Sequence, residues 1–230
     1  MKKYLAFFQK EFANVATYRG PLFIWTLTSV FQLLIMTALW KSVAAGQTIA
    51  GYTRPELITY YLVAVLLERL IHWLPFYGTV EEIKSGEISI SSLIKPFSFY
   101  WRRFFEESGW HLFSVVFSFP IFLSLVFFFR SEIVFSSLAA VLLTLMAAML
   151  GAFVTFGLSL CLGLLAFWFS DVWAVDSLFW AARVTLGGLF LPLSFIPDYF
   201  RGMIDFLPFR YTFSFPLEIY LGKLSIIPRK

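Results

Sequence analysis

TVEEIKSGEISISSLIKP, residues 79–96, is the longest polar interruption in a chain that is otherwise mostly apolar. Its charged side chains require it to lie in water or at a water-facing surface; they are those of Glu81, Glu82, Lys84, Glu87 and Lys95. Thr79 and Glu82 fit a capping box, and Gly86 is a signal for a helix end. Together they predict a short helix over residues 80–85. A second, Ser-rich segment follows and ends before Pro96, because the residue before proline avoids the helical region.

The composition on either side of this stretch indicates a membrane protein. Of 230 residues, 60% are hydrophobic and 14% are charged, whereas ordinary soluble domains are about 25% charged. The apolar runs are continuous and do not alternate as they would in a membrane barrel. The chain is therefore predicted to be an all-α, polytopic helical membrane protein. The net charge of +4 is small and is interpreted through the positive-inside rule, not as a nucleic-acid footprint.

The apolar runs divide the chain into five predicted spans. They cover residues 22–40, 57–77, 110–129, 133–169 and 172–195. Residues 1–19 have the apolar spacing of an amphipathic helix with basic residues on its other face, so this segment is predicted to lie in the membrane interface. Residues 97–108 repeat that pattern and predict a surface helix before the third span. Residues 196–224 are rich in proline and predict short helices that re-enter the membrane only partly.

The run at residues 133–169 has no charge and no proline along 37 positions. One helix of that length would reach about 55 Å, well beyond the bilayer, while two spans would be cramped. Small residues at a spacing of four form a ladder that permits close helix contact; they are Gly151, Thr155, Ser159 and Gly163. The ladder favours a single long helix, tilted or projecting from the membrane.

Four ionisable groups fall inside predicted spans, where they are costly; they are Glu68, Arg69, His72 and Arg183. Glu68 and His72 are four apart and share a helix face, whereas Arg69 points about 100° away toward a different helix. Arg183 is a candidate partner for Glu68, with a pairing to Asp176 as the alternative. Two interpretations stay open. The groups form structural pairs or are hydrated where the helix projects into the cytosol, or they form the polar lining of a transport path or a gate.

Charge counting orients the chain with its N-terminus in the cytosol. The N-terminal segment and the loop at residues 79–108 hold eight Lys and Arg residues, against three in the loops of the opposite side, as the positive-inside rule expects. Five spans would then place the basic C-terminal segment outside, against the rule. Splitting the 133–169 run, or a final span lying outside this sequence, would remove that conflict.

Sequence signatures of catalysis are missing. There is no GxxxxGK[ST], no HExxH and no GxSxG, which would indicate nucleotide binding, a zinc protease or a nucleophile elbow. The single cysteine, Cys161, lies in an apolar run, and no metal-ligand spacing occurs. The chain is predicted to have no catalytic residue, no metal and no cofactor of its own, and not to be an enzyme by itself.

The order of these features resembles a known family. Two stretches carry the resemblance: EEIKSGEISISSLIKPFSFYWRRF at residues 81–104 and GGLFLPLSFIPDYFRGMIDFLPFRYTFSFPLEIYLGK at residues 187–223. They look like the membrane permease of type-2 ABC exporters, in the bacterial branch that has a separate ATPase subunit. The resemblance implies a multi-pass protein of the bacterial inner membrane. It also implies a cytosolic coupling helix after the second span and a re-entrant extracellular segment near the end.

The resemblance also implies partners. The coupling helix would dock on an ABC ATPase that binds ATP and Mg²⁺, through Glu81, Glu82, Lys84, Gly86 and Glu87. A second permease copy or a related permease would complete the substrate path, with membrane lipids around it. The family transports drugs, peptides, lipids and glycans, and the sequence does not indicate which of these is the substrate. Such permeases have six spans, and the last would be missing from this sequence. The alternative is a stand-alone carrier or membrane scaffold that uses Glu68, Arg69 and Arg183.

Overall fold

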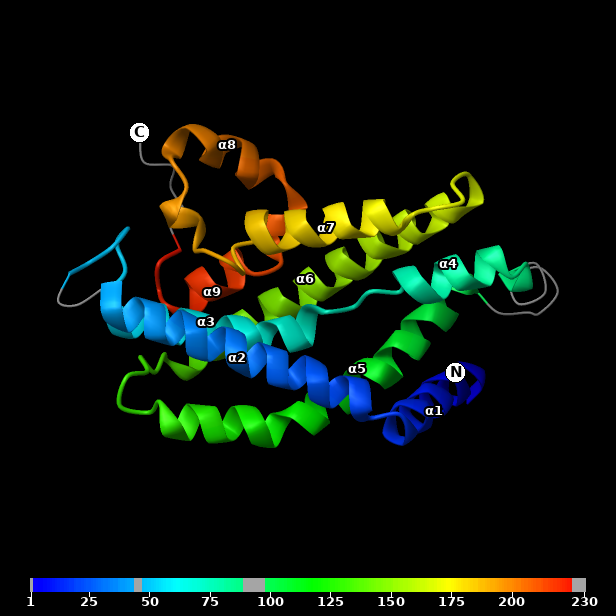
Figure 1. Cartoon of the computed structure of the whole chain (residues 1–230), viewed down its shortest axis with the longest axis horizontal. Coiled ribbons are helices and arrows are strands. Elements are labelled where there is room, and N and C mark those ends of the chain that lie inside the picture. The colour runs from blue at the N-terminus through cyan, green and yellow to red at the C-terminus, as the bar shows by residue number, and fades with distance from the viewer. Residues whose placement is uncertain (1, 44–46, 89–97, 225–230) are drawn as a thin grey trace.

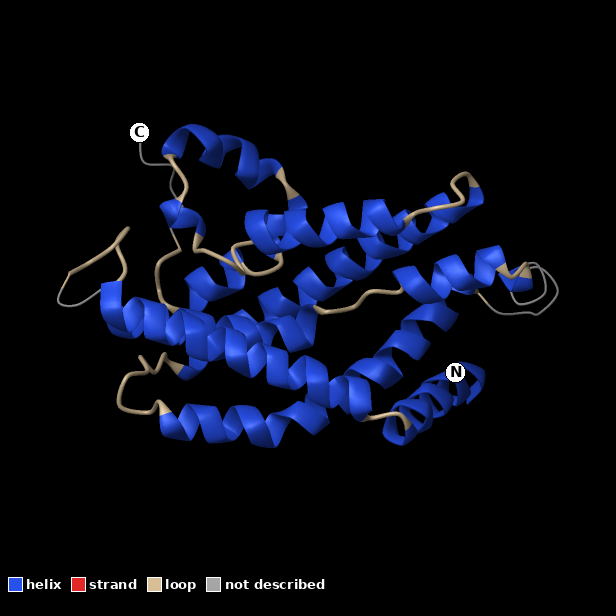
Figure 2. Cartoon of the chain, in the orientation of Figure 1, coloured by secondary structure: helices blue, strands red, loops and turns tan. Residues whose placement is uncertain are grey.

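The computed structural model describes residues 2–43, 47–88 and 98–224, and this part of the chain is helical (Figures 1 and 2). The second segment of the polar stretch, expected before Pro96, lies outside the described residues. Within them, one isolated bridge between Ile49 and Tyr52 is the extent of β structure. The α-helices are α1 (Lys2–Thr17), α2 (Gly20–Val43), α3 (Arg54–Ile71), α4 (Phe76–Lys84), α5 (Phe99–Phe128), α6 (Leu138–Leu164), α7 (Trp173–Leu186), α8 (Asp198–Phe206) and α9 (Ser214–Tyr220).

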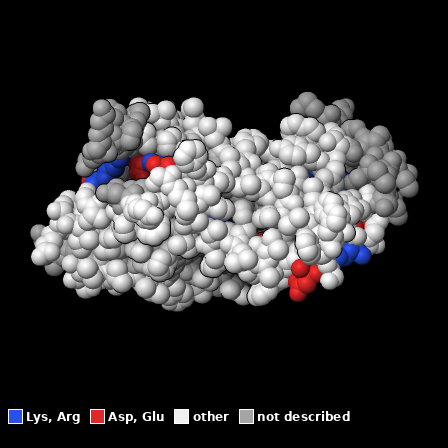
Figure 3. Space-filling model, turned by 90° about the horizontal axis from the view of Figure 1, so that it is seen from above, with Lys and Arg blue, Asp and Glu red and all other residues white. Residues whose placement is uncertain are grey.

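Four helical stretches of the described chain are long and apolar enough to cross a membrane. They are Gly20–Val43, Arg54–Lys84, Phe99–Phe128 and Leu138–Phe167. Figure 1 shows these helices side by side along the long axis, with α1 and α4 at one end of the molecule and α8 and α9 toward the other. On the face seen in Figure 3, charged side chains gather near the two ends and the middle is almost entirely uncharged.

Helix α3 is the centre of the packing. Leu57, Ile58, Tyr60 and Ala64 have no exposed surface, because α2, α5, α6 and α9 all contact this helix. Its start has the local signals of a helix N-terminus: the Thr53 backbone N–H donates to the Glu56 carboxylate at 2.7 Å, and a proline occupies the first turn. Helix α3 itself ends at Ile71, within the predicted second span of residues 57–77, and the membrane-length stretch that contains it continues to Lys84.

A break at residues 72–75 separates α3 from α4, which corrects the predicted helix over residues 80–85. α4 begins at Phe76, after Pro75. Thr79 is thus inside the helix and fully buried, and its hydroxyl has no hydrogen-bond partner. The predicted capping box between Thr79 and Glu82 is wrong, because Pro75 and the buried Phe76 start the helix one turn earlier.

α1 lies along the first half of α5. The rings of Phe12 and Phe113 meet edge to face with centroids 5.2 Å apart, and Tyr4 stacks on Phe105 at 5.6 Å. α5 runs without interruption from Phe99 to Phe128. The surface helix expected over residues 97–108 and the span expected over 110–129 are therefore one element.

The long uncharged run forms one helix, α6, followed by a single 3-10 turn at Leu165–Phe167. Its small-residue ladder is buried along its length. A Cβ added to Gly151 would come within 2.9 Å of the Tyr211 carbonyl oxygen, and one added to Gly163 within 3.0 Å of the Thr79 Cβ. The ladder thus brings α6 against the C-terminal segment at one end and against α4 at the other.

The span predicted over residues 172–195 is shorter in the structure. α7 has 14 residues, or about 21 Å, which is less than the ~30 Å of a hydrocarbon core. It ends at Gly187, and Gly188 has a positive φ of 88° that turns the chain away from the helix axis. Residues 187–224 then form short helical pieces.

These pieces are fastened to α3. The Tyr60 hydroxyl donates to the Gly188 carbonyl at 2.5 Å, and the Tyr61 hydroxyl donates to the Phe190 carbonyl at 2.9 Å. Within the segment itself, the Ser214 N–H donates to the Gly187 carbonyl at 2.8 Å. Backbone groups that leave regular helix are thereby satisfied by protein, the condition for irregular backbone at membrane depth.

Candidate functional site: a charged cavity beside the polar helix

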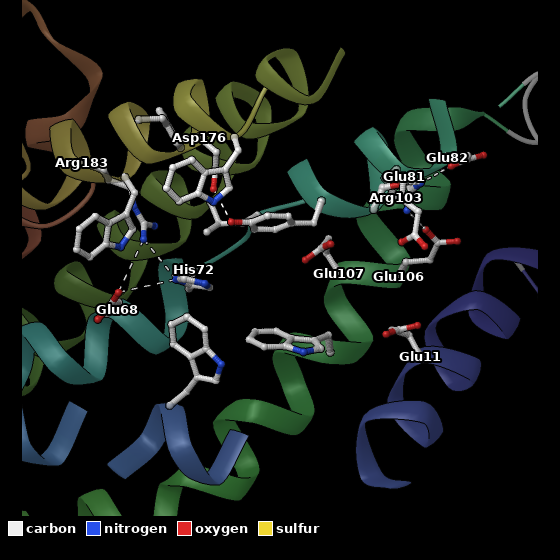
Figure 4. A pocket seen from close by; sticks show the side chains of 18 of the residues that line it. Glu11, Glu68, His72, Glu81, Glu82, Arg103, Glu106, Glu107, Asp176 and Arg183 are labelled. Atoms are coloured by element: carbon white, nitrogen blue, oxygen red, sulfur yellow. Dashed lines mark hydrogen bonds and ion pairs between the residues drawn. The ribbon is translucent and has the colours of Figure 1, made fainter. Parts of the chain in front are cut away.

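A cavity of about 1440 Å³ opens between six helices, α1, α2, α3, α4, α5 and α7. Figure 4 shows charged side chains from several of these helices around it. Two groups of them can be distinguished. The inner cluster comprises Glu68, Arg69, His72 and Arg183, and the clamp comprises Glu82, Arg102, Arg103 and Glu106.

The inner cluster brings together the intramembrane ionisable residues singled out in the sequence. One Glu68 carboxylate oxygen lies 3.8 Å from His72 Nδ1 and 3.8 Å from Arg183 Nη2. Arg183 Nη2 and His72 Nδ1 are 3.3 Å apart. The candidate partnership between Glu68 and Arg183 is thus present as an ion pair, and the Asp176 carboxylate instead accepts a hydrogen bond from the Tyr77 hydroxyl at 2.6 Å.

The two arginines of the inner cluster are held differently. Arg69 reaches α2, where its Nη2 donates to the Ser29 hydroxyl at 2.5 Å and to the Trp25 carbonyl at 2.8 Å. Arg183 is 1% exposed, and its Nε and Nη1 have no hydrogen-bond partner. Its guanidinium instead lies over the Phe213 ring, 5.6 Å from the centroid. Arg69 therefore fastens α3 to α2, while Arg183 keeps hydrogen-bonding capacity next to the cavity.

The clamp joins α4 to α5 through short, buried ion pairs. Both carboxylate oxygens of Glu82 accept from Arg102 Nη2, at 2.5 and 2.7 Å. Arg103 also pairs with Glu82 and with the Gly78 carbonyl. Glu106 bridges the two arginines, at 3.3 Å from Arg102 and 3.1 Å from Arg103. The clamp thus ties Glu82, one turn from the end of α4, to the first turns of α5.

Glu82 departs from its predicted role on a docking surface. It is 6% exposed because it faces α5, so it cannot meet a soluble partner. The other predicted docking residues, Glu81, Lys84, Gly86 and Glu87, are exposed. Helical spacing explains the division, since successive residues of α4 point about 100° apart.

Neither the clamp nor the position of Glu107 was predicted from the sequence. Arg102 and Glu106 have the i, i+4 spacing of a helix pair, but their connection to Glu82 spans 20 residues and crosses a segment with no periodic signal. Glu107 faces the cavity beside Glu106 and Glu11 (Figure 4). Among the described residues, no group of three His, Cys, Asp or Glu side chains could hold a metal ion.

Comparison with known proteins assigns the chain to a family. The model of the family described as ABC-2 family transporter protein matches residues 23–229, most of the chain. The chain belongs to this family. No curated protein and no solved structure matches it. The ABC-2 assignment and the four membrane-length helices together describe a multi-pass membrane protein with the characteristics of a type-2 ABC permease.

Proposed function

We propose that this ABC-2 family chain is the permease subunit of an ATP-driven exporter. A separate ATPase subunit docks on the exposed side of α4, through Glu81 and Lys84 together with Gly86 and Glu87 just beyond the helix. Family membership supports transport. The exposure of these four residues at one end of the molecule supports docking there.

The clamp is the observation that carries this proposal. α4 presents charges outward while Glu82, on its inner side, is bound to two arginines of α5. On another side of α4, Thr79 packs against Gly163 of α6. A force applied to the outer side of α4 is therefore delivered to two membrane-length helices through contacts that are buried and close. This is what a permease needs in order to convert a partner's movement into its own.

The proposal fixes an orientation. α1 lies at the same end as α4 (Figure 1), so docking of a cytosolic ATPase on α4 also places the N-terminus in the cytosol. The positive-inside count of the loops agrees with this placement. A second permease copy or a related permease completes the substrate path, and the inner membrane of a bacterial cell is the location.

Charge reversal on α4 tests the docking. We expect the double variant Glu81→Lys, Lys84→Glu to lose co-purification with the co-expressed ATPase and the stimulation of its hydrolysis, because each charge would then face one of its own sign. A matched control reverses a pair at the opposite end of the molecule, Lys41→Glu with Glu132→Lys, and should retain both properties. Undiminished ATPase binding by the α4 variant would refute the docking surface.

A further inference from the structure

The charge of the cavity is opposite to that of the chain. The residues that line it include eight carboxylates but five Lys or Arg side chains, whereas the whole chain carries a net charge of +4. A concave site with an excess of negative charge concentrates cations and repels anions. The cavity is therefore electrostatically suited to a positively charged molecule.

Four of the eight carboxylates already have charged or tyrosine partners, and two more, Glu81 and Glu87, are exposed residues of the proposed docking surface. Glu82 and Glu106 belong to the clamp, Glu68 is near Arg183, and Asp176 accepts from Tyr77. Glu107 is different: it is partly buried, yet within the described part of the chain its carboxylate has neither a hydrogen bond nor an ion pair. Its nearest opposing charge is that of Arg103, whose guanidinium already binds Glu82 and Glu106 at close range.

The neighbours of Glu107 add to its negative field. Glu11 of α1 and Glu106 act on it as like charges, and both face the same cavity (Figure 4). Burial and neighbouring like charges disfavour the ionised form of a carboxylate, and a cation bound beside it offsets this cost. Glu107 is thus the position at which a positive ligand would gain most.

Aromatic side chains line the cavity on the two sides that carry these acids. On α7, Trp173, Asp176 and Trp180 recur at helical spacing, and both indoles are more than half exposed. On α5, Trp110 lies one turn after Glu107 and also faces the cavity. Indole is the strongest cation–π acceptor among side chains and also packs against apolar groups.

We propose that this cavity binds an amphipathic organic cation, with its positive charge against Glu107 and its apolar part between Trp110 and Trp180. The inference rests on the proposed function, since it identifies this cavity as the part of the export path that contacts the substrate. The inner cluster is not the cation site, because Arg69 and Arg183 place two positive charges around Glu68.

Two probe ions of nearly equal size and opposite charge test the proposal. Equilibrium dialysis of the purified full-length chain in detergent measures binding of tetraphenylphosphonium and tetraphenylborate, with the same detergent on both sides. We expect saturable binding of the phosphonium alone. Glu107→Gln should weaken it roughly thirtyfold or more, which corresponds to about 2 kcal/mol, because one partner of a desolvated charge pair is lost.

Two further variants make the result specific. Trp180→Leu removes an exposed indole with little structural cost and should weaken phosphonium binding roughly threefold to tenfold. Glu132→Gln makes the same chemical change as Glu107→Gln outside the cavity and should bind as the native chain does. Equal binding of the borate, or equal affinity of the Glu107→Gln and Glu132→Gln variants, would overturn the cation site.

The ATPase experiment separates this inference from the proposed function. If the charge reversal on α4 abolishes ATPase binding and the phosphonium is not bound, the exporter proposal stands and the cation site is wrong. If Glu107→Gln weakens phosphonium binding while the charge reversal leaves ATPase binding unchanged, the cation site stands and the α4 docking surface is wrong.

Discussion

The clamp and the inner cluster both combine a glutamate with buried arginines, yet they differ in geometry. In the clamp, Glu82 receives direct hydrogen bonds from Arg102 at 2.5 and 2.7 Å. In the inner cluster, the Glu68 oxygen lies 3.8 Å from both Arg183 and His72, which is beyond hydrogen-bond distance. Direct hydrogen bonds join Glu82 to the arginines of the clamp, whereas Glu68 interacts with Arg183 mainly through charge.

This difference separates two mechanical roles around one cavity. Short charge-assisted hydrogen bonds restrict the orientation of both partners, so we expect the clamp to make α4 and the start of α5 move as one unit. In the inner cluster, Glu68 receives no direct hydrogen bond from an arginine, and two Arg183 nitrogens lack hydrogen-bond partners. Four substitutions test this contrast.

The largest expected effect follows from opening the clamp. Glu82→Gln would leave Arg102 and Arg103 buried with insufficient negative charge, which costs roughly 3–5 kcal/mol of stability in buried pairs. We expect a clear fall in the unfolding temperature of the detergent-solubilised protein, followed by loss of its monodisperse chromatographic peak. Glu81→Gln, one position away but exposed, is the control and should unfold as the native chain does.

Packing beside the clamp is the next target. Gly163→Leu would drive a side chain into Thr79 of α4, an overpacking that costs about 1–3 kcal/mol. Gly157 lies on the same helix with no atom within 4 Å of an added Cβ, so Gly157→Leu should leave stability unchanged. Unfolding temperatures of the two variants make the comparison, and equal values would show that α4 does not depend on the Gly163 contact.

The inner cluster should tolerate loss of its carboxylate better than the clamp does. Glu68→Gln removes a charge but no direct hydrogen bond to an arginine, so we expect a loss of about 1–2 kcal/mol. The same unfolding assay, with Glu82→Gln run alongside, gives the ranking. A larger loss for Glu68→Gln than for Glu82→Gln would reverse the assigned roles.

The smallest effect is expected for an ion pair that is as short as those of the clamp but exposed to solvent. Lys41 and Glu132 approach to 2.5 Å, as close as the clamp, but both side chains are partly exposed. Exposed pairs contribute about 0–1 kcal/mol, so Glu132→Gln should barely change the unfolding temperature. Adding salt should leave the clamp variants' deficit in place while reducing any difference seen for Glu132→Gln.

Most of the helical layout could be predicted from apolar runs, since long uncharged segments leave few alternatives in a membrane. α6 is the clearest case, because its small residues at a spacing of four mark a face that must pack closely. The positions at which helices begin and end were harder to predict. The Thr79–Glu82 pattern matched a capping box, but the same pattern at Thr53 and Glu56 is the one that caps a helix. The motif is local, whereas the start of α4 is set by Pro75 and burial of Phe76.

The part of the site that could be predicted consists of ionisable residues inside apolar spans, because burying a charge in the membrane is energetically unfavourable. Glu68, Arg69, His72 and Arg183 are conspicuous among apolar neighbours, and the structure does bring them together. The clamp could not be anticipated, because charges at a polar loop are usually solvated. Only the fold shows that Glu82 turns inward against Arg102 and Arg103. Glu107 could not be singled out either, because only the folded structure shows that its carboxylate has no ion-pair partner among the described residues.

The hydrogen bond from Tyr60 to the Gly188 carbonyl has a consequence for biosynthesis. The two residues are separated by 128 positions. At 5–20 residues per second, the ribosome needs on the order of ten seconds to make that intervening chain. During this interval the Tyr60 hydroxyl must find another acceptor, in lipid headgroups, water or the insertion machinery. α3, the most buried helix of the finished protein, is therefore among the last to reach its final surroundings.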